Sequence, residues 1–184
     1  VSQELDPPLQ NPVSPVPGLT YDWKRGLIIL DTPTAKAAVG FVDSAISFSD
    51  NIQLDGIGDI APRFVCFVFV STDRRPLRDS RQAILILTTY GENQARVLAA
   101  ATDAVSTDVP RFATLVESWG IGPPVIARPS ATIQLGSHWS WSAVDFSLNP
   151  ISEGSDQQIL RLPAGMPVFR IDLHRRDRSP PIEQ

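Results

Sequence analysis

The first residue that could do chemistry is Asp31, which ends the apolar run 27–30 and precedes Thr32 and Pro33. A carboxylate at the end of a strand can act as a general acid or base. A glycosidase, however, needs a second carboxylate about 5–9 Å away, and the sequence offers no paired candidate. The alternative is a turn, in which the carboxylate accepts a backbone N–H two residues on and the proline fixes φ. We favour the turn and predict no catalytic residue in this chain.

The other acidic, histidine and cysteine residues form no recognisable metal or nucleophile pattern. Asp55 and Asp59 enclose two glycines, as part of a calcium loop would, but the further carboxylates of such a loop are missing, which favours a plain turn. His138 and His174 do not have the spacing of a shared metal site. Cys66, the only cysteine, lies in an apolar run and is predicted to be a small buried hydrophobe. We therefore predict no metal and no cofactor, and structural calcium is not indicated.

The tryptophans are the candidate ligand-binding residues. In the segment 138–148, Trp139 and Trp141 fall on one strand face, opposite a second set of apolar residues, Val144, Phe146 and Leu148. If that second set faces the core, the two rings lie outward, ~7 Å apart, where they could stack on sugar rings. The alternative, which we favour, is a β-bulge near Ala143 that turns both rings inward, or packing on a neighbouring domain. The candidate ligand-binding residues are Trp139, Trp141, Trp119 and His138, although for Trp119 we favour a role as a core or interface anchor.

The elements that must position these residues are short strands. Apolar runs recur about every ten residues and are separated by Gly- and Pro-containing turns, which predicts an all-β, two-layer antiparallel β-sandwich of jelly-roll type. Only 94–106, rich in alanine, would also suit a helix. Residues 64–70 are apolar on both faces and predict a central strand covered on both sides. Residues 168–174 alternate, which predicts a closing, half-exposed strand.

Composition and the chain ends suggest one domain with an extension at each side. Of 184 residues, 42% are hydrophobic, enough for one core. Residues 1–18 hold five prolines and predict an extended linker or strap, lying against the sandwich through Leu5, Leu9, Val13 and Val16. The sandwich is expected at 19–174 and a flexible tail at 175–184. The chain begins without Met or a signal peptide, which favours a piece of a longer protein.

Charge and hydropathy argue against some partners. The net charge of −4 and the pI near 5.1 argue against nucleic acid and anionic membranes. No apolar run approaches the ~20 residues of a membrane span.

Four segments together resemble a known kind of domain: 21–41 (YDWKRGLIILDTPTAKAAVGF), 63–89 (RFVCFVFVSTDRRPLRDSRQAILILTT), 116–135 (VESWGIGPPVIARPSATIQL) and 159–173 (ILRLPAGMPVFRIDL). In this order they resemble the β-sandwich domain appended to the C-terminal side of the catalytic domain in bacterial multidomain glycoside hydrolases. The chain departs from that pattern at Arg74 and Arg75, where a tighter turn with glycine is typical, and in its Pro-rich entry.

The resemblance implies a non-catalytic accessory module that either braces the catalytic domain or binds polysaccharide, in an extracellular or periplasmic enzyme. The catalytic acids of that family lie in another domain, so none is assigned to this chain. Its partners would be polysaccharide or the adjacent catalytic domain. Two alternatives stay open: a free-standing β-sandwich polysaccharide hydrolase or lyase, and a purely structural interaction domain marked by a large apolar surface patch.

Overall fold

The computed structural model describes residues 16–58, 63–93, 97–98, 116–118, 120–121 and 124–175. Within these residues all regular secondary structure is β-strand, which confirms the predicted all-β class. Most of the expected strap (1–18) and of the expected tail (175–184) lies outside the described residues. The chain forms two compact units: residues 1–89 with 128–184, and residues 90–127. Each unit is described by itself.

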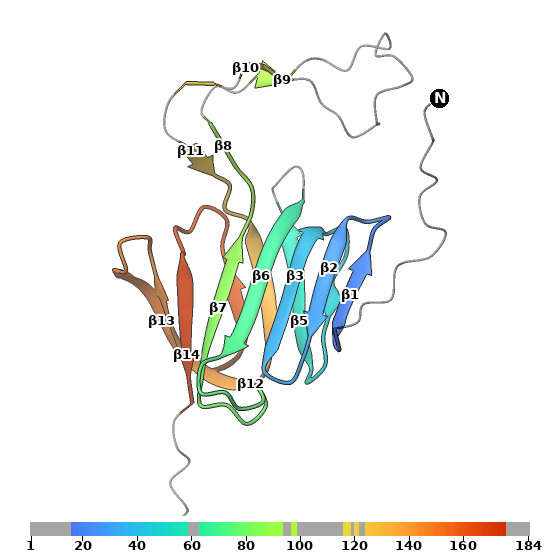
Figure 1. Ribbon diagram of the computed structural model, residues 1–184. Helices are drawn as coiled ribbons and strands as arrows, with labels where there is room; N and C mark the ends of the chain where they lie inside the picture. The colour runs from blue at the N-terminus through green and yellow to red at the C-terminus, as the bar shows by residue number, and fades with distance from the viewer. Residues whose placement is uncertain are drawn as a thin grey trace, which may run out of the picture. The chain divides into compact units, whose positions relative to one another are not determined.

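The larger unit is built on one ten-stranded antiparallel sheet (Figure 1). Its strands are ordered β1-β2-β3-β6-β7-β14-β12-β5-β4, with β13 paired to β12 off this path. Their bounds are β1 (Leu19–Asp22), β2 (Leu27–Asp31), β3 (Ala35–Phe41), β4 (Ile46–Ser47), β5 (Ile52–Gly58), β6 (Phe64–Ser71), β7 (Gln82–Thr88), β12 (Ser130–Val144), β13 (Pro150–Leu162) and β14 (Arg170–His174).

The sheet curls because β12 belongs to two parts of it. The first half of β12 pairs with β5, its second half pairs with β14, and β13 pairs with both halves. Gly136, with φ of 71°, lies between the halves, where the register with β13 shifts. In Figure 1, β2, β3, β6 and β7 stand side by side while β5 and β12 pass behind them. The strands therefore share one hydrogen-bonded sheet, and the two-layer jelly roll stays a prediction.

The core lies between β6 and the strands that curl behind it. The inward side chains of β6 include Phe67 and Phe69, both fully buried. Phe67 stacks on Phe48 with ring centroids 5.6 Å apart, and Phe69 meets the Trp139 ring edge-on at 6.1 Å. Each buried phenylalanine contributes roughly 1.5–3 kcal/mol through burial of apolar area. These aromatic contacts join β6 directly to β12 and to the end of β4.

The other side of β1, β2, β3, β6 and β7 is also apolar, and we call it the outer face. One row runs straight across it, with Tyr21, Ile28, Val39, Cys66 and Thr88 opposite one another on successive strands. The outer face is made of the outward positions of these strands: Leu19, Tyr21, Ile28, Leu30, Ala35, Ala37, Val39, Phe41, Phe64, Cys66, Val68, Val70, Gln82, Ile84, Ile86 and Thr88. Its side chains are partly or largely exposed, whereas the inward side chains of β3 and β6 are buried.

Two strand predictions are thereby corrected in part. β6 is central, as expected, but its outward residues are partly exposed, so Cys66 is only half-buried rather than a core residue. Partial burial raises the pKa of the Cys66 thiol, which favours its protonated form. The alternation expected at 168–174 is confirmed for 170–174, with Ile171 and Leu173 buried, whereas Phe169 precedes the strand and is exposed. That strand, β14, lies between β7 and β12 and closes no edge.

The smaller unit contains two short antiparallel pairs. β8 (Gly91–Asn93) pairs with β11 (Pro124–Ile126), and β9 (Val97–Leu98) pairs with β10 (Val116–Ser118). The strand preferred over a helix for 94–106 is confirmed at Val97 and Leu98; the rest of that segment lies outside the described residues. Trp119 also lies outside them.

Candidate functional site

The predicted sugar-stacking pair, Trp139 and Trp141, lies in the core. Trp139 is 1% exposed and Trp141 is 8% exposed. Rings that cannot reach solvent cannot stack on a polysaccharide, so the exposed arrangement predicted from an unbroken strand is wrong. The inward orientation, part of the interpretation that the sequence favoured, is the one that the structure has.

The outward orientation was predicted for these two rings because the apolar pattern suggests a longer strand than the one that forms. β12 stops at Val144, and Asp145 then caps a turn by accepting the backbone N–H groups of Ser147 and Asn149 at 2.8 and 2.9 Å. Phe146, one of the residues expected in the core, is therefore not on the strand and is 55% exposed. Register shifts in β12 accompany this change, as a bulge would.

Trp141 is held by a polar contact as well as by packing. Its indole Nε1 donates a hydrogen bond of 2.8 Å to Gln157 Oε1 on β13. Gly154, also on β13, leaves the space that this indole needs: a Cβ there would lie 2.5 Å from Nε1. His138, the remaining predicted ligand residue, is exposed, and its Nδ1 lies 3.1 Å from the Asp156 carbonyl oxygen. Trp139, Trp141 and His138 are thus on the same strand but do not form one surface, and Trp119 lies outside the described residues.

Trp139 is covered by the guanidinium group of Arg175. The Arg175 carbon Cζ lies 4.1 Å from the centre of the Trp139 ring, a cation–π contact. Arg175 also donates to the carbonyl oxygens of Leu77 and Arg78 and to the Ser137 hydroxyl. Burial lowers the pKa of Arg175, although the charges of neighbouring aspartates act in the opposite direction. Arg175 was expected to begin a flexible tail; it is instead a partly buried anchor.

Asp31 is part of a charged cluster, not of an Asx turn. Its Oδ1 accepts hydrogen bonds from Lys36 Nζ at 2.6 Å and from Ser49 Oγ at 2.7 Å, and its Oδ2 accepts from the Ser49 backbone N–H at 2.8 Å. Lys36 is completely buried and also donates to the Thr32 carbonyl oxygen at 2.8 Å. A second carboxylate, Asp50 Oδ2, lies 3.3 Å from Lys36 Nζ. The prediction that Asp31 is structural agrees with this geometry, although the hydrogen-bond partners differ from those expected.

Local turn chemistry positions the cluster. Thr32 caps the turn between β2 and β3 by accepting the Ala35 N–H at 3.1 Å. Asp50 and Asn51 both have positive φ, 61° and 57°, as the central residues of a type I′ hairpin turn require. That turn, between β4 and β5, brings Asp50 towards the Lys36 ammonium group.

The cluster borders a cavity of about 180 Å³. Partial burial works to raise the pKa of Asp31, but the hydrogen bonds from Lys36 and Ser49 outweigh it, so the pKa lies below its usual value. A carboxylate in that state is not a proton donor at neutral pH, and its oxygens already accept three hydrogen bonds. The arrangement gives no support to the polysaccharide hydrolase alternative. The cavity lining is Asp31, Thr32, Pro33, Ser49, Asp50, Pro76 and Arg78.

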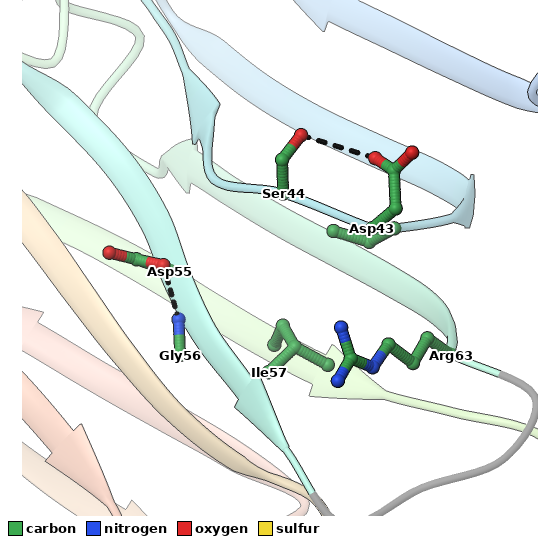
Figure 2. A pocket seen from close by; sticks show the side chains of 7 residues that line it. Asp43, Ser44, Asp55, Gly56, Ile57 and Arg63 are labelled. Carbon is green, nitrogen blue, oxygen red and sulfur yellow. Dashed lines mark hydrogen bonds between the residues drawn. The ribbon is translucent and has the colours of Figure 1, made fainter.

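A second cavity, of about 190 Å³, lies beside β5 (Figure 2). Asp55 does not form the predicted turn: it is in β5, where its carboxylate accepts the Gly56 N–H at 2.6 Å, and Gly56 has φ of 62°. The Ser44 hydroxyl donates a hydrogen bond to the Asp43 carboxylate, which lowers the pKa of Asp43 although desolvation opposes it. Asp43 also forms an ion pair with Arg25. The acidic groups of this cavity thus already have protein partners.

The turn between β6 and β7 is organised by Asp73, which sequence reasoning did not single out. Its carboxylate accepts the Arg81 N–H at 2.8 Å, the Ser71 and Ser80 hydroxyls at 2.8 Å each, and the Arg75 N–H at 3.2 Å. The Arg81 N–H, followed by the other donors, holds the pKa of Asp73 far below its usual value, although desolvation opposes them. The signal was present: serines two residues before and seven residues after an aspartate can both reach it across a loop.

Lys36 was also missed, and its position carried a signal. It lies in β3 in phase with Ala38 and Gly40, the inward positions. A lysine on the buried side of a strand requires an acidic partner, and Asp31 is directly opposite it on β2.

The described residues contain neither a metal-binding cluster nor a membrane-spanning helix, and known proteins give no match. No group of three or more His, Cys, Asp or Glu side chains suited to a metal ion occurs in the described part of the chain. Nor does any helix among those residues have the length and apolar character to cross a membrane. Comparison with protein-family models, with curated proteins and with solved structures gives no match to this chain.

Proposed function

We propose that the chain is a non-catalytic accessory module of a carbohydrate-active enzyme, and that it braces the neighbouring catalytic domain instead of binding polysaccharide. One observation carries the choice between these two roles. The aromatic pair that a binding module would expose, Trp139 and Trp141, is buried in the core. A sugar-stacking ring must be solvent-exposed and pre-oriented, whereas a buried ring stabilises the fold of the module itself.

Two further observations support a structural role. The carboxylates with the most perturbed environments, Asp31 and Asp73, already accept hydrogen bonds from several protein groups. Acidic residues of this kind stabilise loops and leave few lone pairs for a substrate. The resemblance to the accessory domains of glycoside hydrolases supplies the enzyme class and the expected extracellular or periplasmic setting.

The test compares the catalytic domain encoded next to this chain with and without the chain attached. Bracing predicts that the attached form unfolds at a higher temperature and retains activity longer on heating. It also predicts that the isolated chain is not retained on an insoluble polysaccharide panel that includes cellulose and xylan. If the catalytic domain is equally stable without the chain, and the chain binds one of the polysaccharides, the bracing role is wrong and the binding role replaces it.

A further inference from the structure

We propose that the outer face is the surface through which this module docks, and that its occupant is an uncharged, apolar surface of a neighbouring domain in the same polypeptide. This inference rests on the proposed function and names the surface and the partner. The starting observation is that the two sides of strands β3 and β6 are similarly apolar but differ in how far they are buried. Strands β3 and β6 each bury one side against the core, yet their outward residues, such as Val39, Val68 and Val70, are as apolar as the inward ones.

A sheet that faces water on one side normally alternates apolar and polar residues, whereas sheets covered on both sides read as continuous apolar runs. β6 has the second pattern, Phe64 to Val70 without a polar residue, but only one of its sides is fully buried. β7 has the same continuous apolar pattern, and its outward residues include Ile84 and Ile86. Ile28 on β2, 43% exposed, extends the surface. The sequence of these strands is thus suited to a second covering layer.

Charge defines the chemistry of the partner. Every position of the outer face is occupied by an uncharged residue. At its border on β14, Arg170 and Asp172 pair with each other at 3.0 Å, so this border adds no net charge. A surface of this kind offers nothing to a phosphate backbone or an anionic lipid head group. It fits an apolar, uncharged protein surface.

The size of the surface distinguishes a tethered partner from a free one. Strands β1, β2, β3, β6 and β7 span ~24 Å across the sheet and seven residues cover ~23 Å along it, which gives ~550 Å². Covering it would bury about 1,100 Å² over both partners, less than the roughly 1,200–2,000 Å² of complexes between free proteins. Interfaces between domains of one chain extend down to about 600 Å², because the tether supplies a high effective concentration. A neighbouring domain fits this area better than a second copy does.

The experiment uses Cys66, the only cysteine of the chain, which lies in the middle of the outer face. Its labelling by N-ethylmaleimide is followed by mass spectrometry of the peptide that contains it. The isolated chain is compared with the polypeptide that also carries the neighbouring domain. Docking predicts that labelling is about tenfold slower in the longer polypeptide, which corresponds to a docked population near nine in ten.

A matched pair of variants assigns the protection to this face. Ile28→Asp places a charge on the outer face, two strands from Cys66, whereas Ile159→Asp places the same charge on β13. The two isoleucines are 43% and 41% exposed, so their burial is comparable. Ile28→Asp is expected to restore fast labelling and Ile159→Asp to leave Cys66 protected. Melting of both isolated variants, together with the milder Ile28→Thr, checks that the fold is retained.

Four results would overturn the inference: equal labelling in the chain and the longer polypeptide, equal effects of the two variants, slower labelling as the isolated chain is concentrated, or faster labelling when residues 1–15 are removed. The third result would identify a second copy as the occupant, and the fourth the chain's own N-terminal segment. The stability of the catalytic domain is measured in the same samples. If that domain is stabilised while Cys66 stays reactive, the bracing function stands and it uses another surface.

Discussion

Replacing Asp31 with asparagine is expected to cost about 2–3 kcal/mol of unfolding free energy, more than the ~1 kcal/mol of an ordinary turn residue. The reason is Lys36, whose side chain is fully buried while Asp31 is its nearest carboxylate, at 2.6 Å. Asparagine has one acceptor oxygen in place of two and no charge. It can keep a hydrogen bond to Ser49 or to Lys36, but it leaves the ammonium group with only Asp50, at 3.3 Å, as a counter-charge.

The magnitude follows from the geometry. Removing one partner of a fully buried ion pair costs about 3–5 kcal/mol, because the other charge stays buried. Here the Asp31 side chain is 31% exposed and Asp50 remains, so the expected cost lies at or just below the lower end of that range, at about 2–3 kcal/mol. Lys36→Met provides the matched control, since it removes the buried charge itself. The double variant Lys36→Met with Asp31→Asn is therefore expected to be at least ~1 kcal/mol more stable than Asp31→Asn alone.

Urea unfolding at neutral pH, followed by tryptophan fluorescence, measures these differences because Trp139 and Trp141 are buried. The same cluster predicts a pH dependence. The folded-state pKa of Asp31 is lowered, so its stabilisation is complete above the unfolded value of 3.8 and is lost as the pH falls through the folded-state pKa. If Asp31→Asn costs under ~1 kcal/mol and the double variant is no more stable than it, Lys36 does not depend on Asp31 and the explanation is wrong.

Three further substitutions test the local geometry, each by urea unfolding. Trp141→Phe is expected to cost about 1–2 kcal/mol, because it removes the hydrogen bond to Gln157 and part of a buried ring; an unchanged midpoint would contradict the burial of Trp141. Gly154→Ala is expected to be strongly destabilising, since its Cβ would lie 2.5 Å from Trp141 Nε1, and Trp141→Phe in the same chain should recover part of the loss if that contact is the cause. Arg74→Gly is expected to stabilise by up to ~1 kcal/mol, because Arg74 has φ of 63° in the left-handed region that glycine adopts more readily; a clear loss of stability would show that the arginine side chain contributes more than its backbone strain costs.

The strands could be predicted from the sequence where each one is marked by an apolar run and by the turn residues at its two ends. The strands expected at 27–31, 35–41 and 63–71 match β2, β3 and β6 to within a residue at each end, because each is an apolar run bounded by turn residues. The strand expected at 82–90 begins where β7 does but extends two residues past its end. The departure from the expected pattern at Arg74 was also visible in the sequence, and the positive φ there is what the usual glycine would accommodate. The all-β class followed from the spacing of such runs.

What could not be predicted depends on contacts between distant residues. The phase of the Trp139 strand was inferred from Phe146, and only the cap formed by Asp145 shows that Phe146 is past the end of that strand. Separate strands were expected at 130–135 and 138–148. Their merging into the single strand β12, which ends at Val144, depends on pairing with β5, β13 and β14. The partner of Asp31 was sought as a second carboxylate, whereas the partner that the fold supplies is a buried lysine.

The shared strand β12 has a consequence for how this chain folds. β1, β2 and β3 are consecutive hairpins and can pair as soon as they are made. β5 has no such local partner for its second edge: Leu54 must find Ile133, far along the chain. Closing so long a loop is entropically costly and slow. Because β12 then also pairs with β14 and β13, loss of that one strand removes hydrogen bonds from both halves of the sheet. The larger unit should therefore exchange its most protected amides only by complete unfolding, as one cooperative unit.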